Sequence, residues 1–154
     1  MQWKAKDIDV YLEEKEYIDT AVVPLVPIGL GQSMKPTVEK GEFIQLLSLH
    51  LERQFKGRML FLPPYTYLSD EDESKKAGGL LKWKETIKES GFKYVFFLTS
   101  DPVWRNMEQF APESLLFIPS IPLQDMDEQY KQSIMEDQVK QLMKGIVNGW
   151  QASV

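Results

Sequence analysis

Two glycines follow an apolar run near the start of the chain, in VVPLVPIGLGQSMKP (residues 22–36). Nucleotide-binding folds place a phosphate loop between a strand and a helix in this way. A dinucleotide loop would need a third glycine where Met34 stands, and the P-loop pattern fits from neither glycine. We therefore interpret the stretch as a tight turn. The alternative is an anion bound at the N-terminus of the following helix, with Gly29, Gly31, Gln32 and Ser33 as its contacts.

A second polar group follows the strongest apolar run, in TSDPVWR (residues 99–105). A carboxylate at the end of a strand, such as that of Asp101, can hold a metal, orient a base or accept a phosphoryl group. A simpler interpretation is a helix cap, because Ser100 or Asp101 followed by Pro102 is the pattern of an N-cap and a proline at the first helical position. If a ligand binds here, we expect its contacts to be Thr99, Ser100, Asp101 and Arg105.

The remaining titratable residues provide no catalytic set. The acidic run of residues 70–73 fails the calcium-loop pattern, because Lys75 stands where that loop needs glycine and Leu81 where it needs glutamate. His50 is the only histidine, there is no cysteine, and the chain has no G-x-S-x-G segment. We therefore expect no catalytic residue, no metal site and no cofactor.

Hydrophobic spacing predicts the elements that position these residues. Helices are expected from a cap at Asp7 to about Tyr17, and over about 37–56, about 80–90, about 102–109 and about 127–150. Strands are expected over 20–28, 58–68, 92–100 and 115–120, the second broken or ended by Pro63-Pro64. Because Pro24 and Pro27 lie within the first strand, we expect irregular pairing toward its carboxyl end.

Strands that alternate with helices favour a parallel sheet covered on both faces. With right-handed crossovers, residues 1–154 are expected to form a single α/β domain, a three-layer sandwich. Its four-stranded, mostly parallel sheet has the expected order 2-1-3-4. Ligands bind such sheets outside the carboxyl ends of the strands, here between the first and third strands. That arrangement would place residues 29–33 beside residues 99–105.

Composition limits the class of protein. The 154 residues are 43% hydrophobic and carry a net charge of −5, which is typical of a soluble domain and disfavours nucleic acid and anionic lipid as partners. The first residues lack the apolar core of a signal peptide, and no run approaches the roughly 18 apolar residues of a membrane span. We therefore expect a cytoplasmic protein.

Five stretches spread along the chain carry a family resemblance: DIDVYLEEKEYIDTA, LERQFKGR, VFFLTSD, LLFIPSIPLQDM and SIMEDQVKQLM. Through them the chain resembles the YpiF-like family of uncharacterised proteins from Bacillus-type bacteria. The resemblance implies a bacterial, cytoplasmic setting and one intact domain. It implies no activity, cofactor or catalytic residue.

Two functions stay open at this point. The first is a non-catalytic module that binds an unknown protein partner or a small ligand, with Met143 and Trp150 of the Met-rich last helix as candidate partner contacts. Packing of that helix on the sheet is the alternative explanation of the same stripe. The second is a small enzyme or sensor that binds a phosphorylated or nucleotide-like ligand between the first and third strands, where Asp101 and Arg105 would act on the ligand or orient it. We prefer the first, because the chain lacks a nucleophile–base pair, a metal set and an intact phosphate motif.

Overall fold

The computed structural model describes residues 1–107 and 114–152 of the chain. Its helices are α1 (Ala5–Glu13), α2 (Met34–Gln54), α3 (Glu73–Glu89) and α4 (Glu128–Ala152). Its strands are β1 (Thr20–Ile28), β2 (Met59–Phe61), β3 (Tyr65–Leu68), β4 (Tyr94–Thr99) and β5 (Leu115–Phe117), and two short 3-10 helices cover Gly31–Ser33 (η1) and Pro102–Asn106 (η2). The strand pairs are all parallel, so the predicted α/β class is confirmed.

The sheet has the order β2-β1-β4-β5, with β3 also paired to β1. It differs from the predicted sheet in one respect: the predicted second strand is two strands, because Pro63-Pro64 separates β2 from β3. β2 pairs with the first residues of β1, where Thr20 lies opposite Met59, and β3 pairs with the last ones, where Leu25 lies opposite Tyr65. β1 itself is continuous, and what changes near its first proline is the neighbouring strand.

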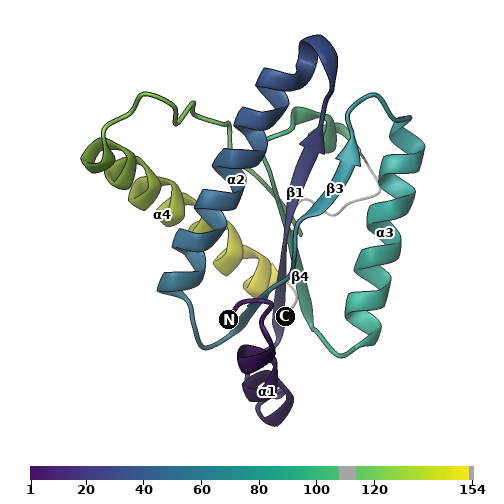
Figure 1. The fold of residues 1–154 in the computed structure, drawn as a ribbon. Helices are drawn as coiled ribbons and strands as arrows, with labels where there is room; N and C mark the ends of the chain where they lie inside the picture. Colours follow the sequence, from purple (N-terminus) through teal and green to yellow (C-terminus); the bar gives the residue numbers. More distant parts are fainter. Residues whose placement is uncertain (108–113, 153–154) are drawn as a thin grey trace.

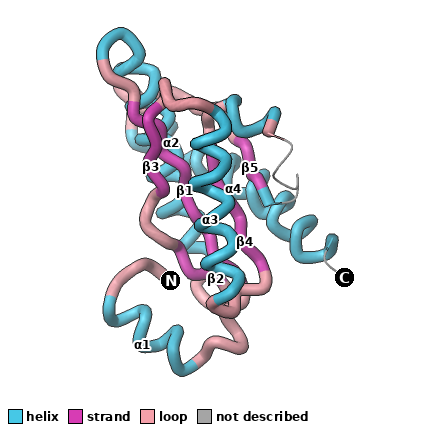
Figure 2. The backbone as a smooth tube through the Cα atoms, turned by 90° about the vertical axis from the view of Figure 1, so that its right-hand side faces the viewer, coloured by secondary structure: helices cyan, strands magenta, loops and turns pink. Residues whose placement is uncertain are grey.

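Helices cover both faces of the sheet, as expected for a three-layer sandwich. α2 and α4 lie on one face and α3 on the other, while α1 lies beyond the amino ends of the strands (Figures 1 and 2). Because β1 and β4 run through the middle, every residue of β4 and all of β1 except Ile28 are buried. Two separate apolar clusters result, one with Phe43, Leu47 and Met135 on the α2–α4 face, and one with Leu80 on the α3 face.

The ends of several elements differ from the prediction. Asp7 is not the cap of the first helix: α1 begins after Lys4, and the Asp7 carboxylate accepts a hydrogen bond from the backbone N–H of Gln2 at 2.7 Å. α2 starts at Met34, three residues earlier than predicted, and the hydroxyl of Thr37 bonds to the carbonyls of Ser33 and Met34 in its first turn. β5 is shorter than the predicted 115–120, and the predicted end of the short helix at residue 109 lies outside the described residues.

Candidate functional site

The structure places the two predicted ligand loops at the same edge of the sheet. β1 and β4 are neighbours, with Val22 opposite Phe96, and both point their carboxyl ends the same way (Figure 1). Residues 29–33 leave β1 at this edge, and residues 99–105 leave β4 beside them. The predicted placement of the loops is therefore confirmed, while their contact with a ligand stays a prediction.

Thr37 closes the turn after β1 from the inside. The backbone N–H of Gly29 donates to Thr37 Oγ1 at 3.1 Å, and this oxygen lies 3.0 Å from the carbonyl oxygens of both Ser33 and Met34. A Cβ on Gly29 would come within 2.8 Å of Thr37 Cγ2, and Gly31 has a φ of +75°, which glycine adopts without strain. These contacts are typical of a tight turn, and they engage the Gly29 N–H that a bound anion would need.

Asp101 is held by neighbours on both sides. Its Oδ1 accepts from the backbone N–H of Val103 at 3.2 Å, as expected of the N-cap of η2. Its Oδ2 accepts from the hydroxyl of Tyr67 at 2.7 Å, and its own N–H donates to Thr99 Oγ1 at 2.9 Å. The indole N–H of Trp104 donates to the same Tyr67 oxygen at 2.9 Å. Both carboxylate oxygens of Asp101 are thus engaged within the protein.

Tyr67 is the residue of this edge that the sequence analysis did not identify. β3 brings it beside Asp101, and its side chain is buried. Burial first, and then the adjacent Asp101 carboxylate, raise the pKa of the Tyr67 hydroxyl well above its ordinary value. The hydroxyl therefore stays protonated near neutral pH. By donating a hydrogen bond to the Asp101 carboxylate, it fixes the orientation of that side chain.

The other predicted contacts of this edge differ in their exposure. The hydroxyl of Ser100 donates to the carbonyl of Ile118 at 2.6 Å, and Thr99 and Ser100 are both buried. The guanidinium carbon of Arg105 lies 4.7 Å from the ring centre of Phe117. Residues 31–33 are exposed. The predicted contacts that face solvent are therefore Arg105 and residues 31–33 of the turn after β1, whereas Gly29 is buried.

Neither a metal site nor a membrane span is found in residues 1–107 and 114–152. In this part of the chain no three histidine, aspartate or glutamate side chains lie close enough together to hold a metal ion. None of its helices is both long enough and apolar enough to cross a membrane. Within the acidic run, Asp72 caps α3 by accepting a hydrogen bond from the Ser74 N–H at 3.0 Å.

The aromatic end of α4 packs against the amino end of the sheet. The indole N–H of Trp150 donates to the hydroxyl of Thr20 at 2.9 Å, and the guanidinium carbon of Arg58 lies 3.7 Å from the centre of the Trp150 ring. Arg58 also donates two hydrogen bonds to Asp19, at 2.9 and 3.1 Å. Met143 is half-buried against the same apolar cluster as Trp150. Packing accounts for these contacts, and a partner role of Met143 and Trp150 stays a prediction.

We expect the pair of Arg58 and Asp19 to make stability fall in acid. Burial raises the pKa of the Asp19 carboxyl, but hydrogen bonds from Arg58 and Thr20 outweigh it and hold that pKa below its ordinary value. A lowered carboxyl pKa adds stability that is present above the unfolded-state pKa of about 3.9 and is lost as the pH falls through the folded-state pKa. Arg58→Met should therefore lower the free energy of unfolding by about 1 kcal/mol near pH 7 and by less near pH 3, the pair being partly exposed and screened by salt. Urea unfolding at the two pH values measures the difference.

An exposed ion pair provides the control. Lys131 lies 3.3 Å from Glu128, whose side chain is 90% exposed. Lys131→Met should change the free energy of unfolding by less than about 0.5 kcal/mol at either pH. If Arg58→Met lowered stability equally at both pH values, the titrating partner would not be the Asp19 carboxylate.

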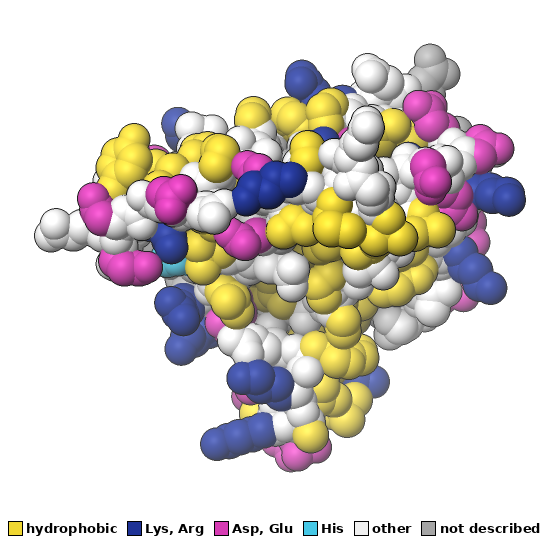
Figure 3. All heavy atoms as spheres, turned by 45° about the horizontal axis from the view of Figure 1, so that its top comes forward, with side chains coloured by type: hydrophobic (Ala, Val, Ile, Leu, Met, Phe, Trp, Pro, Cys, Tyr) yellow, Lys and Arg dark blue, Asp and Glu magenta, His cyan; other side chains and the backbone are white. Residues whose placement is uncertain are grey.

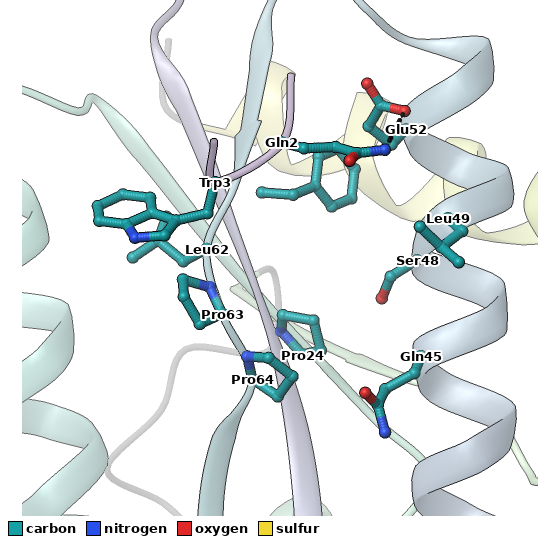
Figure 4. A pocket seen from close by; sticks show the side chains of 11 residues that line it. Gln2, Trp3, Pro24, Gln45, Ser48, Leu49, Glu52, Leu62, Pro63 and Pro64 are labelled. Carbon is teal, nitrogen blue, oxygen red and sulfur yellow. Dashed lines mark hydrogen bonds between the residues drawn. The ribbon is translucent and has the colours of Figure 1, made fainter. Parts of the chain in front are cut away.

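A hollow that the sequence analysis did not predict lies between α2 and the edge of the sheet. It has a volume of about 240 Å³ and opens where Pro63-Pro64 leads from β2 to β3. Figure 4 shows side chains of α2 on one side, Trp3 and the two prolines on the other, and Pro24 of β1 between them. The lining residues are Gln2, Trp3, Pro24, Gln45, Ser48, Leu49, Glu52, Phe61, Leu62, Pro63 and Pro64.

A second hollow of about 450 Å³ continues along α2 toward the carboxyl edge of the sheet. Gln45 lines both hollows, and we refer to the two together as the α2 groove. The second hollow is lined by Val26, Pro27, Ile28, Thr37, Val38, Gly41, Glu42 and Gln45. At this edge of the sheet the molecule exposes several large apolar side chains, and Figure 3 shows hydrophobic side chains gathered there with acidic ones beside them. The exposed apolar side chains are those of Ile28, Leu30, Met34, Val38 and Leu68.

Comparisons with known proteins match almost the whole chain. The model of a protein family of unknown function, DUF2487, matches residues 9–150. The uncharacterized protein YpiF of Bacillus subtilis (strain 168) is 39% identical over 150 residues, which is 97% of this chain and 98% of that protein. No solved structure matches the chain.

Proposed function

Because the chain belongs to the DUF2487 family of proteins of unknown function, we propose its function from its own geometry. The protein is a non-catalytic module that binds a segment of a protein partner in the α2 groove, in the cytoplasm of a bacterium. The observation that carries this proposal is the α2 groove itself, two adjoining and mainly apolar hollows along a single helix. Contiguous exposed apolar surface of this kind marks interaction sites more often than it covers an isolated domain.

The dimensions of the α2 groove favour a chain segment over a small metabolite. Val38 and Leu49 lie eleven residues apart on α2, which corresponds to about 17 Å at 1.5 Å per residue. An extended segment of about five residues spans that length. Val38 is 54% exposed, Leu49 43% and Trp3 56%, so a bound segment would find apolar contacts along the whole groove.

The polar groups of the α2 groove suit hydrogen bonds to a peptide. Gln45 is exposed where the two hollows meet, and its amide can both donate and accept. In Figure 4 the side chain of Gln2 reaches across the hollow toward α2, and its amide donates a hydrogen bond to Glu52 of α2 at 3.4 Å. A few polar groups of this kind fix the register of a ligand whose affinity comes from apolar contacts.

The enzyme or sensor alternative at the carboxyl ends of β1 and β4 has less support. Asp101 already accepts hydrogen bonds at both carboxylate oxygens, and the Gly29 N–H is bonded to Thr37. A phosphorylated ligand would have to compete with these internal partners. We therefore rank binding in the α2 groove first and keep the anion site as the alternative outcome of the same experiment.

Titration of the ¹⁵N-labelled protein with synthetic peptides tests the proposal. The probes are three eight-residue peptides in which valine alternates with lysine, glutamate or serine. We expect at least one to bind with a Kd below about 1 mM and to shift the amide resonances of residues 38–49. Val38→Asp should weaken this binding at least about tenfold, because a buried valine contributes roughly 1.5–3 kcal/mol.

Val147→Asp is the matched control, because Val147 is also an exposed valine on a helix and does not line the α2 groove. Its affinity should equal that of the wild type. If none of the three peptides shifted resonances along α2, the proposal would be wrong. If inorganic phosphate instead shifted the amides of residues 29–33, the anion-binding alternative would replace it.

A further inference from the structure

We propose that the partner segment is extended and basic, and that it pairs with the outer edge of β3 as an added strand. This inference rests on the proposed function, because it specifies the ligand of the α2 groove. Among the described strands β3 pairs with β1 alone, and it lies at one margin of the sheet (Figure 2). An edge strand presents backbone groups that an incoming strand can use.

The register of β3 shows which of its backbone groups face outward. The N–H of Ser69 donates to the carbonyl of Ile28 at 2.9 Å, so residue 69 directs its N–H toward β1. Because successive residues of a parallel strand direct these groups to opposite sides, Tyr67 also faces β1 while Thr66 and Leu68 direct their N–H groups away from it. These two N–H groups are the donors available to an added strand.

On the same side of the sheet, β2 already pairs with one extended residue, Met1. The terminal amino group of Met1 donates to the carbonyl of Met59 at 3.0 Å, and the N–H of Phe61 donates to the carbonyl of Met1 at 2.9 Å. These two bonds on either side of Leu60 are the pattern of one residue in a parallel ladder. Pro63-Pro64 has no N–H groups and separates this pairing from β3. The edge therefore accepts an extended backbone at β2, and no described strand pairs with the outer side of β3.

Side chains of β3 extend the apolar surface of the α2 groove. Leu68 lies opposite Ile28, and Thr66 lies opposite Val26, so each points to the same face of the sheet as a residue that lines the groove. Leu68 is 51% exposed, because α2 does not cover this part of the face. A strand added beside β3 would direct every second side chain to that face. Those alternate positions should be apolar.

Charge at the end of β3 indicates which side chains the partner segment should carry at the positions that lie outside the groove. The loop after β3 contains Asp70, Glu71 and Asp72, Glu73 begins α3, and Glu42 lines the α2 groove on the opposite side. In the described part of the chain none of these carboxylates forms an ion pair. Opposite charge across an interface favours association and rejects partners of like charge. Lysine or arginine should therefore occupy positions of the partner segment that lie outside the groove.

The experiment compares Thr66→Pro with Thr66→Val, measured by fluorescence anisotropy with the labelled valine–lysine peptide. Proline removes the outward N–H of Thr66 and leaves the bonds from residues 67 and 69 to β1 unchanged, whereas valine keeps that N–H. We expect Thr66→Pro to weaken binding at least about tenfold and Thr66→Val to bind within about twofold of the wild type. Hydrogen exchange on the wild type is the second measurement: the valine–lysine peptide should slow exchange of the Thr66 and Leu68 N–H groups at least about tenfold.

Charge is tested with the same anisotropy assay. The valine–lysine peptide should bind at least about tenfold more tightly than the valine–glutamate peptide at low salt, and raising the salt concentration should reduce the difference. Equal affinity of these two peptides would overturn the basic character of the partner.

The outcomes separate this inference from the proposed function. If Thr66→Pro bound as well as Thr66→Val while Val38→Asp weakened binding, strand addition would be wrong and the groove proposal would stand. If Val38→Asp also bound normally, both would fall. A wild-type dimer that Thr66→Pro dissociates in analytical ultracentrifugation would show that a second copy of this chain occupies the edge, which would overturn the partner assignment.

Discussion

Replacing Trp104 with alanine should lower the free energy of unfolding by about 3–5 kcal/mol. Trp104 is fully buried in the apolar cluster on the α3 face, and its ring meets the ring of Tyr67 edge-on at 5.1 Å between centres. Alanine would leave a large cavity that the surrounding side chains fill only in part. Because a domain is typically stable by about 5–15 kcal/mol, this loss would be a large fraction of the total stability. Urea denaturation followed by circular dichroism measures the change.

Two further tryptophan variants separate packing from hydrogen bonding. Trp104→Phe keeps an aromatic ring but loses the indole N–H that donates to Tyr67, so we expect a smaller loss of about 1–3 kcal/mol. Trp3→Ala removes a tryptophan that is 56% exposed, and it should change stability by less than about 1 kcal/mol. A loss below about 1 kcal/mol for Trp104→Ala would mean that the α3 face repacks without this side chain.

Hydrophobic patterns in the sequence predict the order of elements and the two buried central strands. The runs in residues 20–28 and 94–99 are apolar at almost every position, which is typical of strands covered on both faces, and both strands are central in the structure. Pro63-Pro64 correctly predicts a break, because proline cannot donate a ladder hydrogen bond. Helix ends are predicted less well, since a carboxylate such as that of Asp7 can accept from an N–H outside the helix instead of capping it.

The hydrogen bond between Tyr67 and Asp101 could not be predicted from sequence patterns. The two residues are 34 positions apart: Tyr67 lies in β3 and Asp101 follows β4, and β1 lies between these two strands. Only the register of β3 and β4 on β1 brings the hydroxyl and the carboxylate together, and hydrophobic periodicity does not contain that register. The sequence predicts Asp101 as a cap but gives no sign of its second partner.

The α2 groove was missed for a related reason. Periodicity identifies the stripe of α2 that includes Ile44, Leu47 and Leu51, and these residues are buried as expected. Val38 and Leu49 lie off that stripe, and a single exposed apolar residue needs no explanation. They become significant only when the fold places them beside a sheet edge that α2 leaves uncovered.

The turn after β1 supports the second stability prediction: Gly29→Ala should lower the free energy of unfolding by about 1–3 kcal/mol. The new Cβ would lie 2.6 Å from Ser33 Oγ and 2.8 Å from Thr37 Cγ2. Ser33 is exposed and can rotate away, but Thr37 is buried, and its hydroxyl holds the turn through the Gly29 N–H and the carbonyl of Met34. Accommodating the methyl group therefore means displacing the residue that closes the turn. Gly57→Ala is the control, because a Cβ there meets no atom within 4 Å, and its stability should stay within about 0.5 kcal/mol of the wild type.

A double-mutant cycle with Thr37→Ala tests the cause of that loss. Thr37→Ala removes both atoms that the new methyl group would meet on this residue, so Gly29→Ala should lower stability less in that background than in the wild type. Additive losses would mean that the turn moves as a unit and that the contact with Thr37 does not restrict it. The Gly29 N–H would then be free to turn toward solvent, and the anion-binding alternative at the carboxyl ends of β1 and β4 would regain the donor that the present geometry engages.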